Sequence, residues 1–332
     1  SANSQTKLKT FCIGFEESEF DESVYAEKIA NYLETDHTTI ILSCNEGKEL
    51  IKNMQSYYDE PHDDTSDIGQ LLLSKATREH VTVALSGDGG DEFFLGYNQY
   101  QIADEKKNLF LLPLFLRKIL ALPFKFSNKQ NFFLINKGLK LKSIEDFHRI
   151  YYAQLDRRWL NFERVKQDNE KYLFSKKPLL ERLSDFDIKT YLSGDILTKV
   201  DRATMAYSLE ARSPILDYKV LEFAKKLPLK YKFNNGEKKI ILRELLSRYL
   251  PKKLYERPKQ GFAIPINEWF RGDLKSYLLE TLSEEAFCDI PEIEYSFFKK
   301  IMDEHFEGKW NNTSKIYRVL MLVQWLKIYK NI

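Results

Sequence analysis

The sequence predicts an α/β fold with a parallel sheet near its start, followed by a mostly helical region. Three apolar or β-branched runs, KTFCIGF (9–15), HTTIIL (37–42) and VTVAL (81–85), alternate with stretches whose apolar residues have helical spacing. Strands that alternate with helices in this way form parallel sheets covered by helices. The strand pattern fades beyond residue 100, so we expect an α/β part over 1–100 and a mostly helical part over 101–332.

The helices between and after these strands follow from apolar spacing and local end signals. DESVYAEKIANYLE (21–34) has Asp21 as a candidate N-cap, and SDIGQLLLSKATREH (66–80) is the second helix of the α/β part. Beyond residue 180, prolines end a series of helical stretches. These are ILTKVDRATMAYSLEARS (196–213), YKVLEFAKKLP (218–228), KKIILRELLSRYLP (238–251) and a strongly apolar last helix, SKIYRVLMLVQWLKIYK (314–330).

The charge and cysteine content argue against a nucleic-acid-binding protein and against a fold held by disulfides or zinc. The formal net charge is +2, which does not indicate a nucleic-acid-binding protein, but residues 1–100 carry 7 basic and 19 acidic side chains. An acidic first third and a basic remainder fit a cation and a polyanionic ligand that meet in one cleft, or two parts docked by charge. Cys12, Cys44 and Cys288 form no disulfide or zinc pattern, and the start is polar, so we expect a cytoplasmic protein.

The stretch from Lys106 to Lys142 holds nine basic residues and no acidic one, interleaved with Phe and Leu. A helix on a membrane surface or a nucleic-acid patch is conceivable for such a composition. Pro113 and Pro123 interrupt it, however, and the run LFLLPLFL (109–116) is too short to span a bilayer. We therefore expect helices packed over the core, without a membrane or nucleic acid as partner.

The run SGDGGDE begins at Ser86, directly after the third strand, at the edge where parallel sheets bind ligands. Its serine and glycines let a ligand approach the backbone closely and present N–H groups to phosphate. Asp88, Asp91 and Glu92 carry the oxygen ligands that Mg²⁺ prefers. The run predicts a nucleotide and metal site, and a solvated acidic turn is the alternative.

A second group of charges lies in YLSGDILTKVDRATMAYSLEARSPILD (191–217). Asp195 and Lys199 fall within its mostly helical part, together with further acidic and basic residues. Ion pairs on a helix surface explain such a set, so the pattern by itself indicates a structural role.

Two later stretches carry loop signals. NNGEKKIILRELL (234–246) has a turn at Asn235-Gly236 before a helix that opens with lysines. A lysine opposes the positive end of a helix dipole, which indicates a nearby anion or, more simply, a solvated charge. ERPKQGFAIPINEWFRGDL (256–274) reads as a packed loop with Phe262, Trp269 and Phe270 as apolar anchors.

Taken together, these stretches resemble the synthetase domain of the glutamine-hydrolysing asparagine synthetases. The resemblance covers nearly the whole chain, in order, through TFCIGF, DEPHDDTSDIGQLLLSK, LSGDGGDEFFLGY, KVDRATMAYSLEARSPILD, EKKIILRE, RPKQGFAIP and EWFRGDL. It implies an α/β domain of the ATP-pyrophosphatase (adenine-nucleotide alpha hydrolase) type. It also implies that ATP adenylates a carboxylate, after which ammonia released from glutamine attacks the acyl-AMP to give an amide and AMP.

The resemblance implies roles for the nucleotide side of the site. Ile13 matches the position whose backbone meets adenine, and Ser86 and Gly87 match the pair that contacts the nucleotide. Asp88 matches an acidic position tied to adenylate formation, although many relatives carry the longer Glu there. Lys239 matches the lysine that stabilises charge near the α-phosphate. This is catalysis by positioning and electrostatics.

The remaining roles concern the metal and the acceptor. Asp91 and Glu92 are candidates for organising Mg²⁺ on the ATP phosphates. Asp64, Thr65 and Ser66 lie in the loop where the acceptor acid would sit. The expected acceptor is aspartate, and an acceptor that is a sugar acid or a peptide carboxylate, or a non-catalytic scaffold, are the alternatives.

Two departures from the family pattern bear on activity. A pyrophosphate loop of the form SGGxDS is absent, and so is a glutaminase domain with its cysteine nucleophile at position 1. We therefore expect this chain to be a fragment that folds in part and is inactive alone, with sheet edges left unpaired by a missing strand. The full-length protein is expected to supply the glutaminase domain, and the resemblance leaves a homodimer open.

Overall fold

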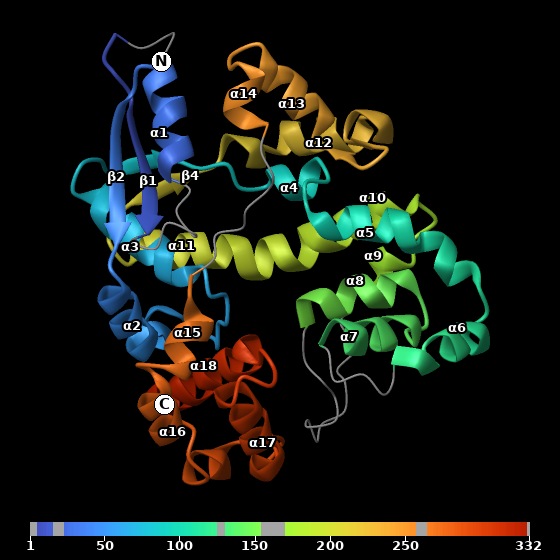
Figure 1. Ribbon diagram of the computed structural model, residues 1–332. Coiled ribbons are helices and arrows are strands. Elements are labelled where there is room, and N and C mark those ends of the chain that lie inside the picture. Colours follow the sequence, from blue (N-terminus) through green and yellow to red (C-terminus); the bar gives the residue numbers. More distant parts are fainter. Residues whose placement is uncertain (1–4, 16–22, 125–129, 154–169, 257–263, 331–332) are drawn as a thin grey trace.

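The computed structural model describes residues 5–15, 23–124, 130–153, 170–256 and 264–330, and Figure 1 shows its arrangement. The described strands form three two-stranded sheets. They are β1 (Lys9–Phe15) with β2 (Asp36–Leu42), β3 (Val83–Leu85) with β4 (Glu210–Arg212), and β5 (Phe233–Asn234) with β6 (Glu237–Lys238).

Helices make up most of the described residues. The first half of the chain contains α1 (Ser23–Tyr32), α2 (Cys44–Asn53), α3 (Asp67–Arg78), α4 (Gly90–Phe93), α5 (Asn98–Lys106), α6 (Leu114–Leu120), α7 (Gln130–Leu139) and α8 (Ile144–Ala153). The second half contains α9 (Glu170–Leu173), α10 (Leu179–Asp187), α11 (Leu197–Met205), α12 (Tyr218–Lys226), α13 (Ile240–Ser247), α14 (Lys252–Tyr255), α15 (Ile266–Arg271), α16 (Lys275–Thr281), α17 (Tyr295–Phe306) and α18 (Thr313–Tyr329).

The parallel strands are present, but the expectation of one continuous sheet is wrong for the described residues. β1 pairs with β2 from Lys9↔Asp36 to Phe15↔Leu42. β3 pairs instead with β4, more than a hundred residues later, from Val83↔Glu210 to Leu85↔Arg212. The segment EAR, which the sequence pattern places in a helix, is therefore a strand. Its three residues are too few for a period-2 pattern to show.

A long helical rod crosses the middle of the molecule (Figure 1). It consists of α10, a nine-residue π-helix (Ile188–Ile196) and α11, which follow one another without a break. One end of the rod contacts α5 and α9, and the other end contacts α3. π-Helical turns are rare and often mark functional positions, so the π-helix at the centre of this rod indicates a functional site there.

The largest apolar core joins the α/β part to the end of the chain. Ile51, Ile68 and Leu71 of α2 and α3 are fully buried together with Tyr317 and Leu320 of α18. The last apolar helix thus packs on the molecule as the sequence predicts. The proposed boundary near residue 100 stays a prediction.

The described parts of the stretch from Lys106 to Lys142 are mostly helical as expected, but their predicted packing over the core is wrong in part. Leu111, Phe115 and Leu122 are more than half exposed, as are Ile119 and Leu134. Periodicity shows that a helix has an apolar face, and not what covers that face. None of the helices in the described ranges is long and apolar enough to cross a bilayer.

Other local signals are confirmed only in part. The stretch predicted as a loop forms α15 over Ile266–Arg271, and the helix expected to open with Lys238 and Lys239 begins at Ile240 because Lys238 lies in β6. The turn at Asn235-Gly236 has the two positive φ angles, 49° and 83°, that a tight hairpin needs. Trp269 and Phe270 are buried anchors at α15. The candidate N-cap Asp21 and the anchor Phe262 lie outside the described residues.

Leu320→Ala should lower the free energy of unfolding by about 2–5 kcal/mol, because Leu320 is fully buried in the shared core and its loss leaves a cavity. Urea unfolding would measure the change. The matched control is Leu279→Ala on α16, where the leucine is 49% exposed and the expected effect is within about 0.5 kcal/mol. Equal effects of the two substitutions would contradict the core assignment.

Candidate functional site

The SGDGGDE turn is held in a defined shape after β3. Ser86 Oγ donates to Asp88 Oδ2 over 2.7 Å, and Ser213 Oγ donates to the Asp88 carbonyl oxygen over 2.7 Å. Gly89 has φ of 87°, and a Cβ at this position would lie 2.5 Å from Leu216 Cδ2, so only glycine fits. A Cβ at Gly87 would meet nothing within 4 Å. The turn is therefore rigid, and the backbone at Gly87 is open to a close approach.

Lys239 and Asp91, two of the residues assigned to the site from the sequence, meet over this turn. The β5–β6 hairpin delivers Lys239 to the start of α13, and its Nζ lies 3.0 Å from Asp91 Oδ1. A Cβ built on Gly90 would lie 3.8 Å from the same Nζ. The ammonium group therefore sits beside the first turn of α4, with about a third of the side chain exposed to solvent.

Two backbone features show that this pair is closely fitted. Lys239 has φ of 53°, in the left-handed region, which costs about 1–2 kcal/mol for a residue with a Cβ. A Cβ on Gly96 would lie 1.9 Å from Asp91 Oδ1 and 2.0 Å from Lys239 Cε. Strained backbone of this kind clusters at functional sites, so the geometry favours a functional lysine over a solvated surface charge.

The Glu92 carboxyl group is directed into the protein and away from this pair. Glu92 is 1% exposed, and Tyr97 Oη donates to its Oε1 over 2.5 Å. Burial raises the pKa of Glu92 although the Tyr97 hydrogen bond opposes the shift, and the nearby Asp91 and Asp187 charges add to it. Asp91 and Glu92 are adjacent in sequence, yet they serve different partners.

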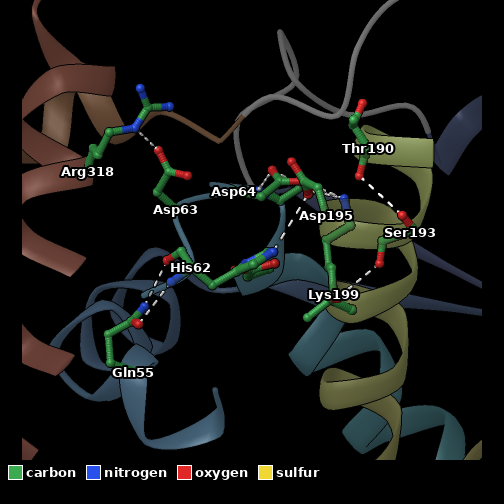
Figure 2. Close-up of polar contacts among 12 residues, drawn as sticks. Gln55, His62, Asp63, Asp64, Thr190, Ser193, Asp195, Lys199 and Arg318 are labelled. Carbon is green, nitrogen blue, oxygen red and sulfur yellow. Dashed lines mark hydrogen bonds and ion pairs between the residues drawn. The ribbon is translucent and has the colours of Figure 1, made fainter. Parts of the chain in front are cut away.

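A second polar cluster forms where the 62–67 loop meets α11 (Figure 2). Asp64 Oδ1 accepts hydrogen bonds from the Ser66 N–H at 2.9 Å and from the Ser66 hydroxyl at 2.8 Å. Lys199 Nζ donates to Asp64 Oδ2 at 2.5 Å and to Ser66 Oγ at 2.8 Å. Thr65 is half-buried between them. The predicted acceptor loop thus gains a cation that the sequence pattern assigns to a helix surface.

Charge balance fixes the protonation of this ion pair. Burial by itself raises the pKa of Asp64, but the Lys199 ammonium and the Ser66 hydrogen bonds outweigh it and hold that pKa below its ordinary value. Burial lowers the pKa of Lys199, and the Asp64 and Asp195 charges reverse the shift, so its pKa is raised. Both partners are therefore ionised near neutral pH.

Asp195 and His62 complete the cluster. His62 stacks on Tyr58 with ring centroids 4.6 Å apart, and its Nδ1 lies 2.7 Å from Asp67 Oδ2. Its Nε2 faces Asp195 Oδ1 at 3.7 Å, which is beyond hydrogen-bonding distance (Figure 2). Within the described residues this Asp195 oxygen is buried without a hydrogen-bond partner. A buried oxygen in that state is a position for a donor from a ligand.

The pKa of Asp195 is raised to about 7. Burial is the largest cause, and the Asp64 charge adds to it, while Lys199 and His62 oppose it. For His62, burial lowers the pKa of the imidazole, but the hydrogen bond and charge of Asp67 and the charge of Asp195 outweigh burial, so the pKa is raised. Three carboxyl groups in a small volume with one lysine and one histidine can bind a ligand that carries a positive charge.

The rod aligns the two halves of the site. Asp187, Tyr191, Asp195 and Lys199 lie four residues apart, the spacing that places side chains on one side of a helix. Tyr191 contacts the Tyr97 ring edge-on, with centroids 5.7 Å apart. Burial, and then the Asp195, Asp64 and Glu92 charges, raise the pKa of Tyr191. This tyrosine therefore lies between the Lys239 half and the Lys199 half.

The interpretation of the 191–217 charges as ion pairs along one helix is wrong for three of them. Lys199 pairs with Asp64, and Arg202 pairs with Asp59, both far away in sequence. Asp195 faces His62. The one signal in the sequence was the four-residue spacing, because it concentrates polar groups on one face of a half-buried helix.

The assignment of a metal to Asp91 and Glu92 stays a prediction. Within the described ranges, no group of three or more His, Cys, Asp or Glu side chains forms a metal site. Mg²⁺ in nucleotide sites is commonly held by one or two carboxylates and the phosphates. Asp91 suits such a role because a quarter of its side chain is exposed beside Lys239, whereas Glu92 is engaged with Tyr97.

Comparisons with known proteins point to one family. The profile described as "Asparagine synthase" matches residues 1–327. The chain is 30% identical over 335 residues to "Asparagine synthetase [glutamine-hydrolyzing] 1" of Bacillus subtilis (strain 168), a match that covers 97% of this chain and 52% of that protein. It is 24% identical over 329 residues to "Asparagine synthetase [glutamine-hydrolyzing]" of Mesocricetus auratus, which covers 93% of this chain and 45% of that protein.

A shorter match of 34% identity over 212 residues joins it to "Putative asparagine synthetase [glutamine-hydrolyzing] 2" of Methanocaldococcus jannaschii, covering 60% of this chain and 40% of that protein. The chain spans about half the length of the relatives that it matches over nearly all of its own length. Because the family profile extends over almost the entire sequence, the chain belongs to the asparagine synthase family.

Proposed function

We propose that this chain is the synthetase part of an ATP-dependent amide ligase that makes L-asparagine from L-aspartate. The side-chain carboxylate of aspartate attacks the α-phosphorus of ATP, and pyrophosphate leaves as the acyl–phosphate bond forms. Ammonia, produced from glutamine by a glutaminase domain of the longer protein, then attacks the acyl carbon. The nitrogen loses a proton to solvent, and AMP leaves with the electron pair of the broken bond. The Lys239–Asp91 pair over the SGDGGDE turn is the observation that carries this proposal.

In the proposed arrangement, the turn and Lys239 bind the nucleotide side. The backbone of Ile13 in β1 meets adenine, and Ser86 and Gly87 contact the nucleotide where the backbone is open. Mg²⁺ would reach Asp91 and neutralise phosphate charge, and the role proposed for Glu92 is then indirect, through Tyr97. Lys239 stabilises the charge that develops near the α-phosphate, a contribution that preorganised cations make to transition states.

The second cluster binds the acceptor in this proposal. The α-ammonium group of an amino acid would donate to the Asp195 oxygen that has no hydrogen-bond partner in the described residues. Asp64 and Ser66 position Lys199, which would face the α-carboxylate. An acceptor without a free amino group would leave this Asp195 oxygen without a hydrogen-bond donor from the ligand, and this favours an amino acid over a sugar acid.

Lys239→Ala should lower the rate of amide formation about a hundred- to a thousandfold in the full-length protein, because one preorganised cation is lost from the reaction centre. Release of AMP and pyrophosphate with aspartate and glutamine would measure it. The matched control is Lys238→Ala, which removes the neighbouring lysine that donates to Asn98 Oδ1. Near-normal turnover of the Lys239 variant, with an unchanged melting temperature, would refute its role.

Asp88→Asn should slow adenylate formation more than it weakens ATP binding. The amide keeps an oxygen that can accept from Ser86, so the turn is preserved while the negative charge is removed where charge is rearranged. ATP–pyrophosphate exchange and ATP affinity, measured on the same variant, separate the two effects. Exchange at the wild-type rate would reduce Asp88 to a turn residue.

Binding of the acceptor should weaken as pH falls through about 7, the pKa of Asp195. The raised pKa means that Asp195 is a carboxylate above this pH and a neutral acid below it, so the partner for an α-ammonium group is lost on acidification. The KM for aspartate against pH would show the step, and Asp195→Asn should remove it and raise KM at alkaline pH. A step that persists in this variant but disappears in His62→Gln would assign it to His62.

A further inference from the structure

The surface formed by η2 (Lys107–Leu111), α6, η3 (Leu122–Phe124) and α7 is apolar to an unusual degree. Ten of the 26 large apolar side chains that are exposed among the described residues fall between positions 111 and 135. The most exposed are Leu111 at 80% and Phe115 at 62%, and the others are Leu112, Leu116, Ile119, Leu120, Leu122, Phe132, Leu134 and Ile135. Large exposed apolar patches on a protein mark interaction surfaces.

Internal polar contacts hold this α6–α7 surface together. Arg117 is 2% exposed, and its guanidinium donates to the carbonyl oxygens of Leu112 (3.1 Å), Leu139 (3.2 Å), Leu141 (2.6 Å) and Lys142 (3.2 Å). Asn136 Nδ2 donates to the Ala121 carbonyl oxygen over 2.6 Å. The unit thus places its arginine inside and its leucines outside. A segment built for core packing would place them the other way round.

Charge on the same unit has a single sign. The sequence from 106 to 142 has nine Lys and Arg and no Asp or Glu. Arg117 is occupied inside, and Lys107 of η2 pairs with Asp104. The exposed lysines on the other described helices and turns of this unit are Lys118, Lys137, Lys140 and Lys142. The surface of an anionic bilayer is negative, which complements exposed lysines beside exposed apolar side chains on the same unit.

We propose that the α6–α7 surface binds peripherally to an anionic lipid membrane. The apolar side chains enter the boundary between headgroups and acyl chains, and the lysines contact the headgroups. α6 and α7 are too short to span a bilayer, so the contact is interfacial. This inference reverses the sequence-based expectation for this segment, and it is independent of the proposed ligase activity.

The position of this surface allows membrane contact without blocking the candidate site. Figure 1 shows α6 at the far end of the molecule from β1, β2 and α1. The rod that carries Asp195 and Lys199 runs between these two ends. A bilayer against α6 would therefore leave the Lys199 cluster accessible.

Co-sedimentation with vesicles tests the proposal on the full-length protein. We expect binding to vesicles of phosphatidylcholine with about 30% phosphatidylglycerol, little binding to phosphatidylcholine alone, and weaker binding at about 0.5 M salt because the lysine contribution is screened. The triple variant Leu111→Glu, Phe115→Glu and Ile119→Glu should lower the partition coefficient at least about tenfold. All three side chains are more than half exposed, so the fold should be retained.

The matched control is Leu279→Glu with Ile328→Glu, which changes apolar residues that are 49% and 44% exposed elsewhere and should leave vesicle binding unchanged. Absence of binding to phosphatidylglycerol vesicles would overturn the proposal. So would an equal loss in the control variant. A third outcome would also overturn the proposal: the protein self-associates in sedimentation velocity, the triple variant does not, and neither binds vesicles. The surface would then bind a second copy of the chain.

Discussion

Charged side chains of the central rod pair with partners on both halves of the molecule, and these pairs fix how the halves are arranged. Asp187 is fully buried and accepts from Tyr100 on α5 at 2.5 Å, and it lies 2.7 Å from His148 on α8. Lys199, at the other end, is held by Asp64 in the loop before α3. A buried charge without its partner costs several kcal/mol. These pairs hold α5 and α8 at one end of the rod and the loop before α3 at the other. The candidate site lies between the two ends.

The contact between Asp91 and Lys239 depends on the missing side chain of a glycine. Asp91 and Lys239 approach one another across Gly96, where any Cβ would overlap both. Lys239 also accepts a left-handed backbone to reach that position. The surroundings of Lys239 and Lys199 therefore suit different ligands. Lys239 is partly exposed and suits a ligand with developing negative charge, while Lys199 is enclosed by carboxylates and suits a ligand that carries both charges.

Two apolar helix groups of this chain end in opposite environments. α18 buries Tyr317 and Leu320 against α2 and α3, and its contacts join the last helix to the α/β part. Leu116 and Leu120 of α6 are exposed. The side of α6 that faces the protein carries Arg117, which donates hydrogen bonds to buried backbone carbonyl groups. The two helices are similarly apolar. Most apolar side chains of α18 face neighbouring helices and are buried, whereas most of those of α6 face solvent.

Four local features could be predicted from the residues alone: the SGDGGDE turn after a strand, the Asn235-Gly236 hairpin, the parallel strand direction and the closing apolar helix. These depend on φ preferences and periodicities within a few residues. Other features depend on contacts between distant segments: β3 pairs with β4, Lys199 meets Asp64, Glu92 turns towards Tyr97, and ten large apolar side chains of the described residues between 111 and 135 are exposed. The physical reason is that the partner of a strand edge, and the cover of a helix face, come from segments far along the chain. A strand as short as Glu210–Arg212 leaves no periodic trace, and a lysine at helical spacing looks the same whether its partner lies four residues away or on another element.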